Sequence, residues 1–156
     1  ILSEMSGATI IACDITPERL EFAKQLGAGY AINSTDKDAA EQIQKITGIK
    51  KAKVVIDFVG ASSTIDLGTK IVGLDGDLTI VGLGGGKYEY NMNGLPFGVS
   101  LTNPYWGSRA ELIEVIGLAR QKKIHIEVEK YSLDQALEVY DKLRHGQIKG
   151  RAVLVP

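Results

Sequence analysis

The sequence predicts an α/β protein built on a mostly parallel, doubly wound sheet. Short apolar runs typical of buried strands alternate with amphipathic helical patterns along the whole chain. No linker, internal repeat or low-complexity segment interrupts that alternation. We therefore expect residues 1–156 to form a single domain, since 156 residues suffice for a substantial core.

The first half of the chain contains three expected strands and three expected helices. The helix signals are local: Thr16 is a cap residue, Pro17 suits the first helical position, and Gly27 and Gly48 each end a helical pattern. Residues before Gly7 look like the end of a further helix. The expected strands are 8–14, 30–32 and 53–57, and the expected helices are 17–26, 36–47 and 62–72.

The second half continues the pattern with shorter and less regular segments. Ser108 is expected to cap a helix that reaches about Gln121, and Tyr88, Tyr90 and Met92 alternate with polar residues as in a half-exposed strand. The other expected elements are a turn at 74–77, strands at 78–81, 98–101, 124–128 and 152–155, and a helix at 133–144.

Composition excludes several classes of function. The net charge of −1 with interspersed acids and bases gives no electrostatic footprint for nucleic acid or an anionic membrane. No apolar run approaches the roughly 20 residues that span a bilayer, and Ile1–Met5 lacks the basic start of a signal peptide. The single Cys13 cannot form a disulfide within the chain, which indicates a reducing compartment and a cytoplasmic protein.

No catalytic or metal-binding constellation is expected in this chain. One cysteine and two histidines, His125 and His145, are far apart and lack the spacing of metal ligands. His145 at a helix C-terminus is explained by the helix dipole. No Ser-His-Asp set or nucleophile elbow is present.

Asp14 is the most informative candidate residue. It closes an apolar strand and directly precedes a helix start, where a carboxylate of an α/β fold can accept hydrogen bonds from a nucleotide ribose. No basic residue stands at positions 15–17 to bind a 2′-phosphate, which favours NAD over NADP. Arg19 lies one helical turn further on, where it could reach the ribose edge or adenine. The alternative for Asp14 is a plain acid at a strand end, and the alternative for Arg19 is a solvated arginine on the helix face.

The usual glycine-rich phosphate turn lies about 20 residues before such an acid, and only 13 residues precede Asp14. We therefore expect the fold to lack its first strand and that turn, as a truncated dinucleotide-binding domain would.

The glycine cluster at residues 82–86 does not replace that turn. The dinucleotide-binding pattern Gly-x-Gly-x-x-Gly would need a glycine at position 87, which is Lys87. The cluster also precedes a strand-like pattern, whereas that motif must open a helix. It is either a flexible loop or a place where a cofactor approaches the backbone closely. Asp57, at the end of another strand, is either a polar contact in the ligand crevice or a helix-entry acid.

Several segments together resemble the medium-chain, zinc-dependent alcohol dehydrogenases, particularly archaeal and thermophilic members, in their cofactor-binding part. Their order and spacing along the full length carry the resemblance. The segments are Gly7–Asp14, Gln25–Ala28, Val55–Gly60, Ile80–Leu83, Tyr105–Leu112 and Gly150–Pro156.

The resemblance implies a Rossmann-like fold and a set of cofactor contacts. Asp14 would bind the adenosine ribose with Arg19 nearby, and Ile15 and Val59 would pack on either side of adenine, with Gly60 in the same crevice. The remaining implied contacts are the backbone of Val81, Gly82, Leu83 and Trp106 to the nicotinamide carboxamide, and Arg151 to the pyrophosphate. It also implies a homo-oligomer that joins sheets through an edge near residues 98–101.

The family's zinc ligands and substrate domain have no counterpart here, so the resemblance implies an oxidoreductase that acts on an alcohol or polyol only in a complete enzyme. NAD is the implied cofactor, and zinc is implied for the complete enzyme without being bound by this chain. Tyr105 and Trp106 hint at an aromatic wall of the substrate pocket, and the alternative is that one of the two is a packed core aromatic. The alternatives are an S-adenosylmethionine-dependent methyltransferase-like domain and a non-catalytic nucleotide sensor.

Overall fold

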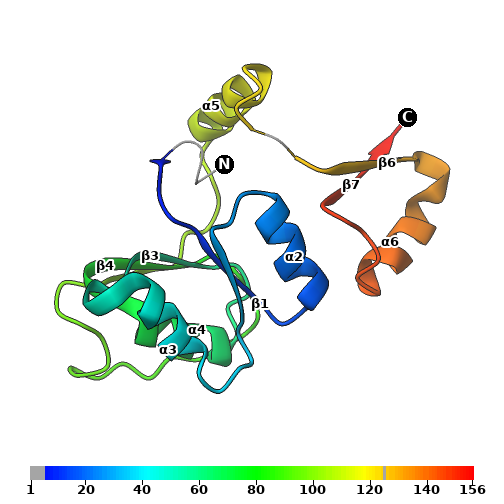
Figure 1. Cartoon of the computed structure of the whole chain (residues 1–156). Coiled ribbons are helices and arrows are strands. Elements are labelled where there is room, and N and C mark those ends of the chain that lie inside the picture. The colour runs from blue at the N-terminus through cyan, green and yellow to red at the C-terminus, as the bar shows by residue number, and fades with distance from the viewer. Residues whose placement is uncertain (1–5, 125) are drawn as a thin grey trace. The chain divides into compact units, whose positions relative to one another are not determined.

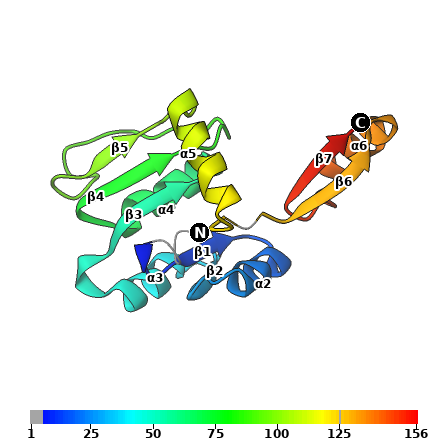
Figure 2. The same cartoon turned by 90° about the horizontal axis from the view of Figure 1, so that it is seen from above.

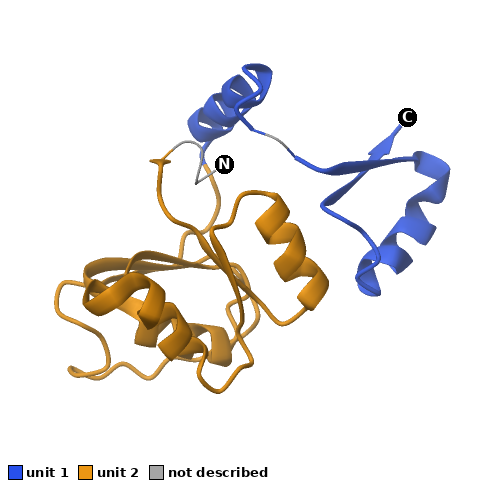
Figure 3. Ribbon diagram, viewed as in Figure 1, with its two compact units in different colours: residues 1, 108–156 blue, residues 2–107 orange. Residues whose placement is uncertain are grey.

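The computed structural model describes residues 6–124 and 126–156, and it forms two compact units. One unit ends at Gly107 and the other runs from Ser108 to Pro156 (Figure 3). The single domain expected for residues 1–156 stays a prediction.

The unit that ends at Gly107 alternates strands and helices (Figure 1). Its elements are β1 (Ile11–Asp14), α2 (Pro17–Gln25), β2 (Tyr30–Asn33), α3 (Ala39–Thr47), the 3-10 turn η1 (Gly48–Lys50), β3 (Ala52–Asp57), α4 (Ser62–Ile71), β4 (Val72–Ile80) and β5 (Ser100–Thr102). β1 pairs with β2, and β3, β4 and β5 form a second sheet in that order (Figure 2). All of these pairings are parallel.

The unit that begins at Ser108, blue in Figure 3, is smaller. It contains α5 (Arg109–Arg120), β6 (Val128–Ser132), the 3-10 turn η2 (Leu133–Gln135), α6 (Ala136–Arg144) and β7 (Arg151–Val155). β6 and β7 pair in parallel from Val128–Arg151 to Ser132–Val155. The α/β fold with parallel strands is therefore confirmed.

The unit that ends at Gly107, orange in Figure 3, has a core that spans both of its sheets. Ile32, Ala39, Ile43 and Ile71 form one buried cluster, and Ile11 of β1 and Val55 of β3 both pack against it. Ile43, Val72 and Leu78 are the largest fully buried side chains. Burial of these side chains supplies the main stabilising free energy of the unit and fixes α3 and α4 against the strands.

Several helix predictions are confirmed by the observed helix ends. α2 begins at Pro17 after an extended Thr16, and α5 begins after Ser108. The Ser108 hydroxyl accepts a hydrogen bond from the Glu111 amide at 3.2 Å, and the Ser108 amide donates to Glu111 Oε2 at 2.5 Å. This reciprocal pair is a capping box, which the Ser-x-x-Glu spacing specifies locally.

Two strand and turn predictions are wrong. Residues 74–77 belong to β4 as a bulge, because Ala52 pairs with Val72 while Val54 pairs with Asp77. Residues 88–92 form no strand, since no neighbouring strand pairs with them within the described chain. Polar-apolar alternation alone does not supply the hydrogen-bonding partner that a strand needs.

Other boundaries shift by a few residues. α3 begins at Ala39, three residues late, because Asp36 first accepts a turn hydrogen bond from the Ala39 amide. The strand expected at 98–101 is β5, and β6 begins where the expected strand 124–128 ends. The helix end expected before Gly7 falls mostly on residues 1–5, which lie outside the described residues, as does His125. Within the described part of the chain, no helix is long and apolar enough to cross a membrane.

Candidate functional site

Asp14 stands at the carboxyl end of β1, half-buried, with Ile15 exposed beside it. Its Oδ1 accepts a hydrogen bond from the Thr16 amide at 2.9 Å, which fixes the carboxylate in the turn into α2. Its Oδ2 lies 3.9 Å from an Arg19 guanidinium nitrogen. That distance is too long for a hydrogen bond, so Oδ2 keeps acceptor capacity for a hydroxyl donor.

Asp57, at the carboxyl end of β3, is buried and fully engaged. Its Oδ1 accepts hydrogen bonds from the Val59 and Gly60 amides at 2.8 and 3.0 Å. Its Oδ2 accepts a hydrogen bond from the Thr64 hydroxyl at 2.8 Å. Asp57 therefore shapes the turn between β3 and α4, and the helix-entry alternative describes it better than a ligand contact.

The glycine cluster after β4 lies along this turn as a second strip of backbone. The Gly84 amide donates to the Val59 carbonyl at 2.9 Å, and the Gly86 amide donates to the Gly60 carbonyl at 2.8 Å. A Cβ on Gly84 would lie 2.6 Å from the Val59 oxygen, and one on Gly86 would lie 2.5 Å from the Ala61 carbonyl carbon. Gly84 and Gly86 pack backbone against backbone, which leaves no room for a side chain at either position.

The two strand ends therefore form one structured surface, which we call the glycine clasp (Val59–Ser62 against Gly82–Gly86). Gly60 has a φ of 69° and is buried, and Gly82 fills the space beside it. The hydrogen bonds exclude the flexible-loop alternative for the cluster. The observed property is close packing of backbone on backbone, and close approach of a cofactor stays a prediction.

The apolar candidates around the clasp are solvent-exposed. Val59 and Val81 are 55% and 42% exposed, and Leu83 is 89% exposed. Tyr105 and Trp106 are also exposed and meet edge to face, with ring centroids 5.9 Å apart. Neither is a packed core residue in this unit, so the alternative that one of the two is a core aromatic is wrong. Exposed apolar side chains beside polar backbone are typical of ligand crevices.

Arg151 opens β7 in the other unit, where it pairs with Val128, and its amide donates to the Glu127 carbonyl at 2.9 Å. Its pyrophosphate role stays a prediction. Among residues 6–124 and 126–156, no group of three metal-ligating side chains occurs. His145 caps the end of α6, with Nδ1 2.8 Å from the Asp141 carbonyl oxygen. The described residues therefore do not fit a zinc site.

Cys13 precedes Asp14 on β1. Its side chain reaches solvent, yet the protein atoms around the sulfur raise the pKa of its thiol. A raised pKa keeps the thiol neutral at physiological pH, so Cys13 is no activated nucleophile.

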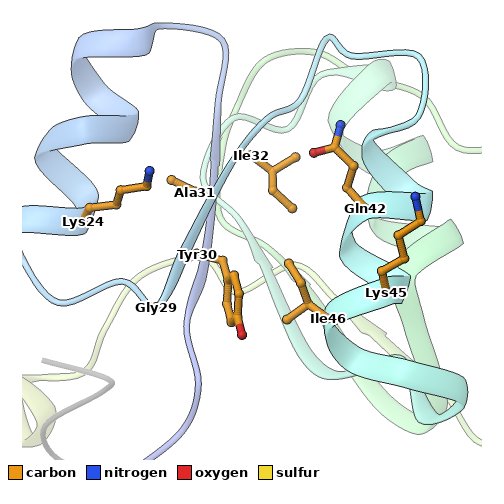
Figure 4. Close-up of a pocket in the computed structure, with 8 residues that line it drawn as sticks. All are labelled: Lys24, Gly29, Tyr30, Ala31, Ile32, Gln42, Lys45 and Ile46. Carbon is orange, nitrogen blue, oxygen red and sulfur yellow. The ribbon is translucent and has the colours of Figure 1, made fainter.

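A hollow in the described part of the chain lies away from these strand ends. It has a volume of about 390 Å³ beside the start of β2, between Lys24 of α2 and Lys45 of α3 (Figure 4). The carboxyl end of β2 is Asn33, which pairs with Asp14, and neither residue lines the hollow. None of the expected cofactor residues lines it either.

Sequence reasoning missed three contributors to the glycine clasp: Ser62, Thr64 and the pairing of Gly84 and Gly86 with the β3–α4 turn. The hydroxyl of Thr64 bonds a residue seven positions earlier, and Ser62 bonds the Lys87 amide 25 positions later. The only sequence signal was the alternation of glycines at 82, 84 and 86.

Comparison with known proteins places the chain in context. The model of the zinc-binding dehydrogenase family matches residues 1–121. NAD-dependent alcohol dehydrogenases of Sulfurisphaera tokodaii and Saccharolobus solfataricus are 34% and 30% identical over the whole chain. The crystal structure of the alcohol dehydrogenase from Aeropyrum pernix superposes with a TM-score of 0.85 at 34% identity over 99% of this chain. The chain spans 46% of the first two relatives and 45% of the third.

Proposed function

The chain belongs to the zinc-binding dehydrogenase family, and on that premise we propose that it is the NAD-binding part of an alcohol or polyol dehydrogenase. The observation that carries the proposal is Asp14, which ends β1 with one carboxylate oxygen held by Thr16 and the other open to a hydroxyl donor. The 2′- and 3′-hydroxyls of an adenosine ribose are such donors.

Residues of the unit that ends at Gly107 fit a bound dinucleotide. Asp14 accepts hydrogen bonds from the ribose hydroxyls, while Ile15 and Val59 offer exposed apolar surface to adenine beside Gly60. The clasp presents backbone without side chains at Gly82, so Val81, Gly82 and Leu83 can approach the nicotinamide carboxamide together with Trp106. Arg151 belongs to the other unit, and its pairing with the pyrophosphate stays a prediction from the family resemblance. Bound NAD supplies the hydride acceptor, and these residues bind and orient it.

The preference for NAD over NADP follows from charge. A carboxylate at Asp14 repels a 2′-phosphate, and no basic side chain stands at positions 15–17 to attract one. Two features oppose the methyltransferase alternative: the family match over residues 1–121 and the similarity to named alcohol dehydrogenases over the whole chain.

The complete enzyme is proposed to oxidise a small alcohol with a zinc ion held by residues outside this chain. The matched relatives are about twice as long as the chain, which leaves room for a zinc site and a substrate domain. We further propose that residues 1–156 act as one dinucleotide-binding domain of a cytoplasmic enzyme. β5, the last strand of its three-stranded sheet, offers an edge through which copies can join.

Calorimetric titration of the purified protein with NADH, NADPH and S-adenosylmethionine tests the proposal, after its intact mass has been measured. We expect NADH to bind at least tenfold more tightly than NADPH, and S-adenosylmethionine not to bind. Tighter binding of NADPH would overturn the cofactor assignment. Binding of S-adenosylmethionine without NADH would support the methyltransferase alternative.

A further inference from the structure

The glycine clasp has a support beneath it that no expected cofactor contact includes. α4 begins at Ser62, directly after the turn that carries Val59 and Gly60. Two hydroxyls of its first turn, Ser62 and Thr64, reach the two backbone strips of the clasp. Every other hydrogen bond named for the clasp is made by backbone groups or by the Asp57 carboxylate.

Thr64 acts on the β3–α4 strip through Asp57. Its hydroxyl lies 2.8 Å from Asp57 Oδ2 and 2.9 Å from the Ala61 carbonyl oxygen, and it accepts a hydrogen bond from the Ala61 amide at 3.1 Å. A hydroxyl has one proton, and the buried carboxylate is the stronger acceptor. Asp57 Oδ1 in turn holds the Val59 and Gly60 amides.

Ser62 acts on the strip that follows β4. Its hydroxyl accepts a hydrogen bond from the Lys87 amide at 2.9 Å. This bond follows two backbone hydrogen bonds between the strips, from the Gly84 amide to the Val59 carbonyl and from the Gly86 amide to the Gly60 carbonyl. One helical turn thus anchors both strips, so that a shift of α4 would move them together.

We propose that Thr64 and Ser62 are positioning residues of the cofactor crevice, which hold Val59–Gly60 and Gly82–Gly86 in fixed register from the first turn of α4. The inference rests on the proposed function, because it assigns cofactor contacts to both strips. Neither hydroxyl touches the cofactor. Thr64 acts through Asp57, and Ser62 acts through the Lys87 backbone. Fixed backbone donors and acceptors bind a ligand more tightly because less ordering is needed on binding.

The chain offers a matched control on the same helix. The Thr69 hydroxyl is buried and donates to the Asp66 carbonyl oxygen at 2.8 Å. Thr69 lies in the last turn of α4, away from the clasp, so Thr69→Val removes a comparable hydrogen bond without loosening the crevice. Thr64→Ser keeps the hydroxyl and should restore the wild-type behaviour.

The test measures NADH binding by calorimetry and amide hydrogen exchange at Gly84 and Gly86. For Thr64→Val we expect an NADH dissociation constant about tenfold above wild type and faster exchange at both amides. For Ser62→Ala, which changes an exposed side chain, we expect a rise of about threefold. Thr64→Ser and Thr69→Val should stay within about twofold of wild type, with unchanged exchange.

The outcomes separate the inference from the proposed function. Wild-type protein that fails to bind NADH would defeat the proposed function, and the exchange rates would then decide the inference. The inference would be overturned if the Gly84 and Gly86 amides exchanged no faster in Thr64→Val than in Thr69→Val. Should Thr64→Val fail to fold, Ser62→Ala decides in the same way: faster exchange at Gly86 supports the inference, and unchanged exchange overturns it.

Discussion

Gly82 lies directly against the carbonyl group of Val59, so that a Cβ on Gly82 would overlap the Val59 backbone. The contact joins the segments that follow two neighbouring parallel strands, β3 and β4. Backbone atoms cannot move aside as the end of a flexible side chain can. The main chain therefore leaves no room for a side chain at position 82.

Replacing Gly82 with alanine should therefore destabilise the protein. The added methyl group forces the two backbone strips apart and breaks the bond from Gly84 to Val59, at a cost of about 2–3 kcal/mol. Urea unfolding monitored by circular dichroism measures this. A wild-type unfolding midpoint for Gly82→Ala would contradict the contact.

Gly117 is the matched control for Gly82. It lies inside α5, and a Cβ there would meet nothing within 4 Å. Alanine is the better helix former because glycine loses more backbone entropy on folding. Gly117→Ala should raise the free energy of unfolding by about 0.5–1 kcal/mol in the same experiment. The same substitution thus has opposite signs at the two positions.

Tyr88 carries a hydroxyl that is buried without a hydrogen-bond partner in the described part of the chain. An unpaired buried hydroxyl opposes folding, so Tyr88→Phe should be neutral or stabilising by up to about 1 kcal/mol. Tyr131→Phe provides the contrast, because the Tyr131 hydroxyl donates to Glu129 at 2.5 Å and its removal should destabilise. Thermal unfolding of both variants checks the signs. A clear loss of stability in Tyr88→Phe would show that the hydroxyl has a partner.

Local signals predicted the elements whose determinants lie close together in the sequence. The start of α5 was predictable because Ser108 and Glu111 are three residues apart and bond each other. Asp14 was found because an apolar run and a helix start flank it on either side. In both places, a few adjacent residues contain the whole physical cause.

The parts that could not be predicted depend on pairing across distance. Residues 74–77 have the composition of a turn, yet their register against β3 places them in a bulged strand. The role of the glycines at 82–86 was undecidable because their partners, Val59–Ser62, lie more than 20 residues earlier. Thr64 had no signal at all, since a helical threonine is ordinarily a solvated or backbone-bonded residue.

Asp14→Asn should weaken NADH binding about tenfold and narrow the difference between NADH and NADPH. The amide keeps one acceptor oxygen but loses the charge that strengthens bonds to ribose hydroxyls and repels a 2′-phosphate. Asp66→Asn removes the same charge from an exposed pair with Lys70 on α4 and serves as control. Parallel calorimetric titrations measure both effects. An unchanged ratio of the two dissociation constants in Asp14→Asn would place cofactor selection elsewhere.

Glu111 provides a pH-dependent test of the α5 capping box. Hydrogen bonds from the Ser108 amide and hydroxyl lower the pKa of the Glu111 carboxyl below its ordinary value of 4.5. A carboxyl whose pKa is lower in the folded state stabilises that state at pH above 4.5, and the contribution disappears as the pH falls through the folded-state pKa. Glutamine resembles the protonated acid, so Glu111→Gln removes only the charge-dependent part.

We therefore expect wild type to unfold at a higher temperature than Glu111→Gln at pH 7, and the difference to shrink as the pH falls below 4.5 and Glu111 takes up its proton in the folded state. Thermal scans of helical circular dichroism across that range measure it. Glu114→Gln, which removes a charge beyond the first turn of the same helix, should show no such convergence with wild type. A wild-type advantage over Glu111→Gln that does not shrink at any pH below 4.5 at which the protein still folds would mean that the carboxylate charge does not stabilise the cap. Ser108 would then begin α5 through its hydroxyl alone.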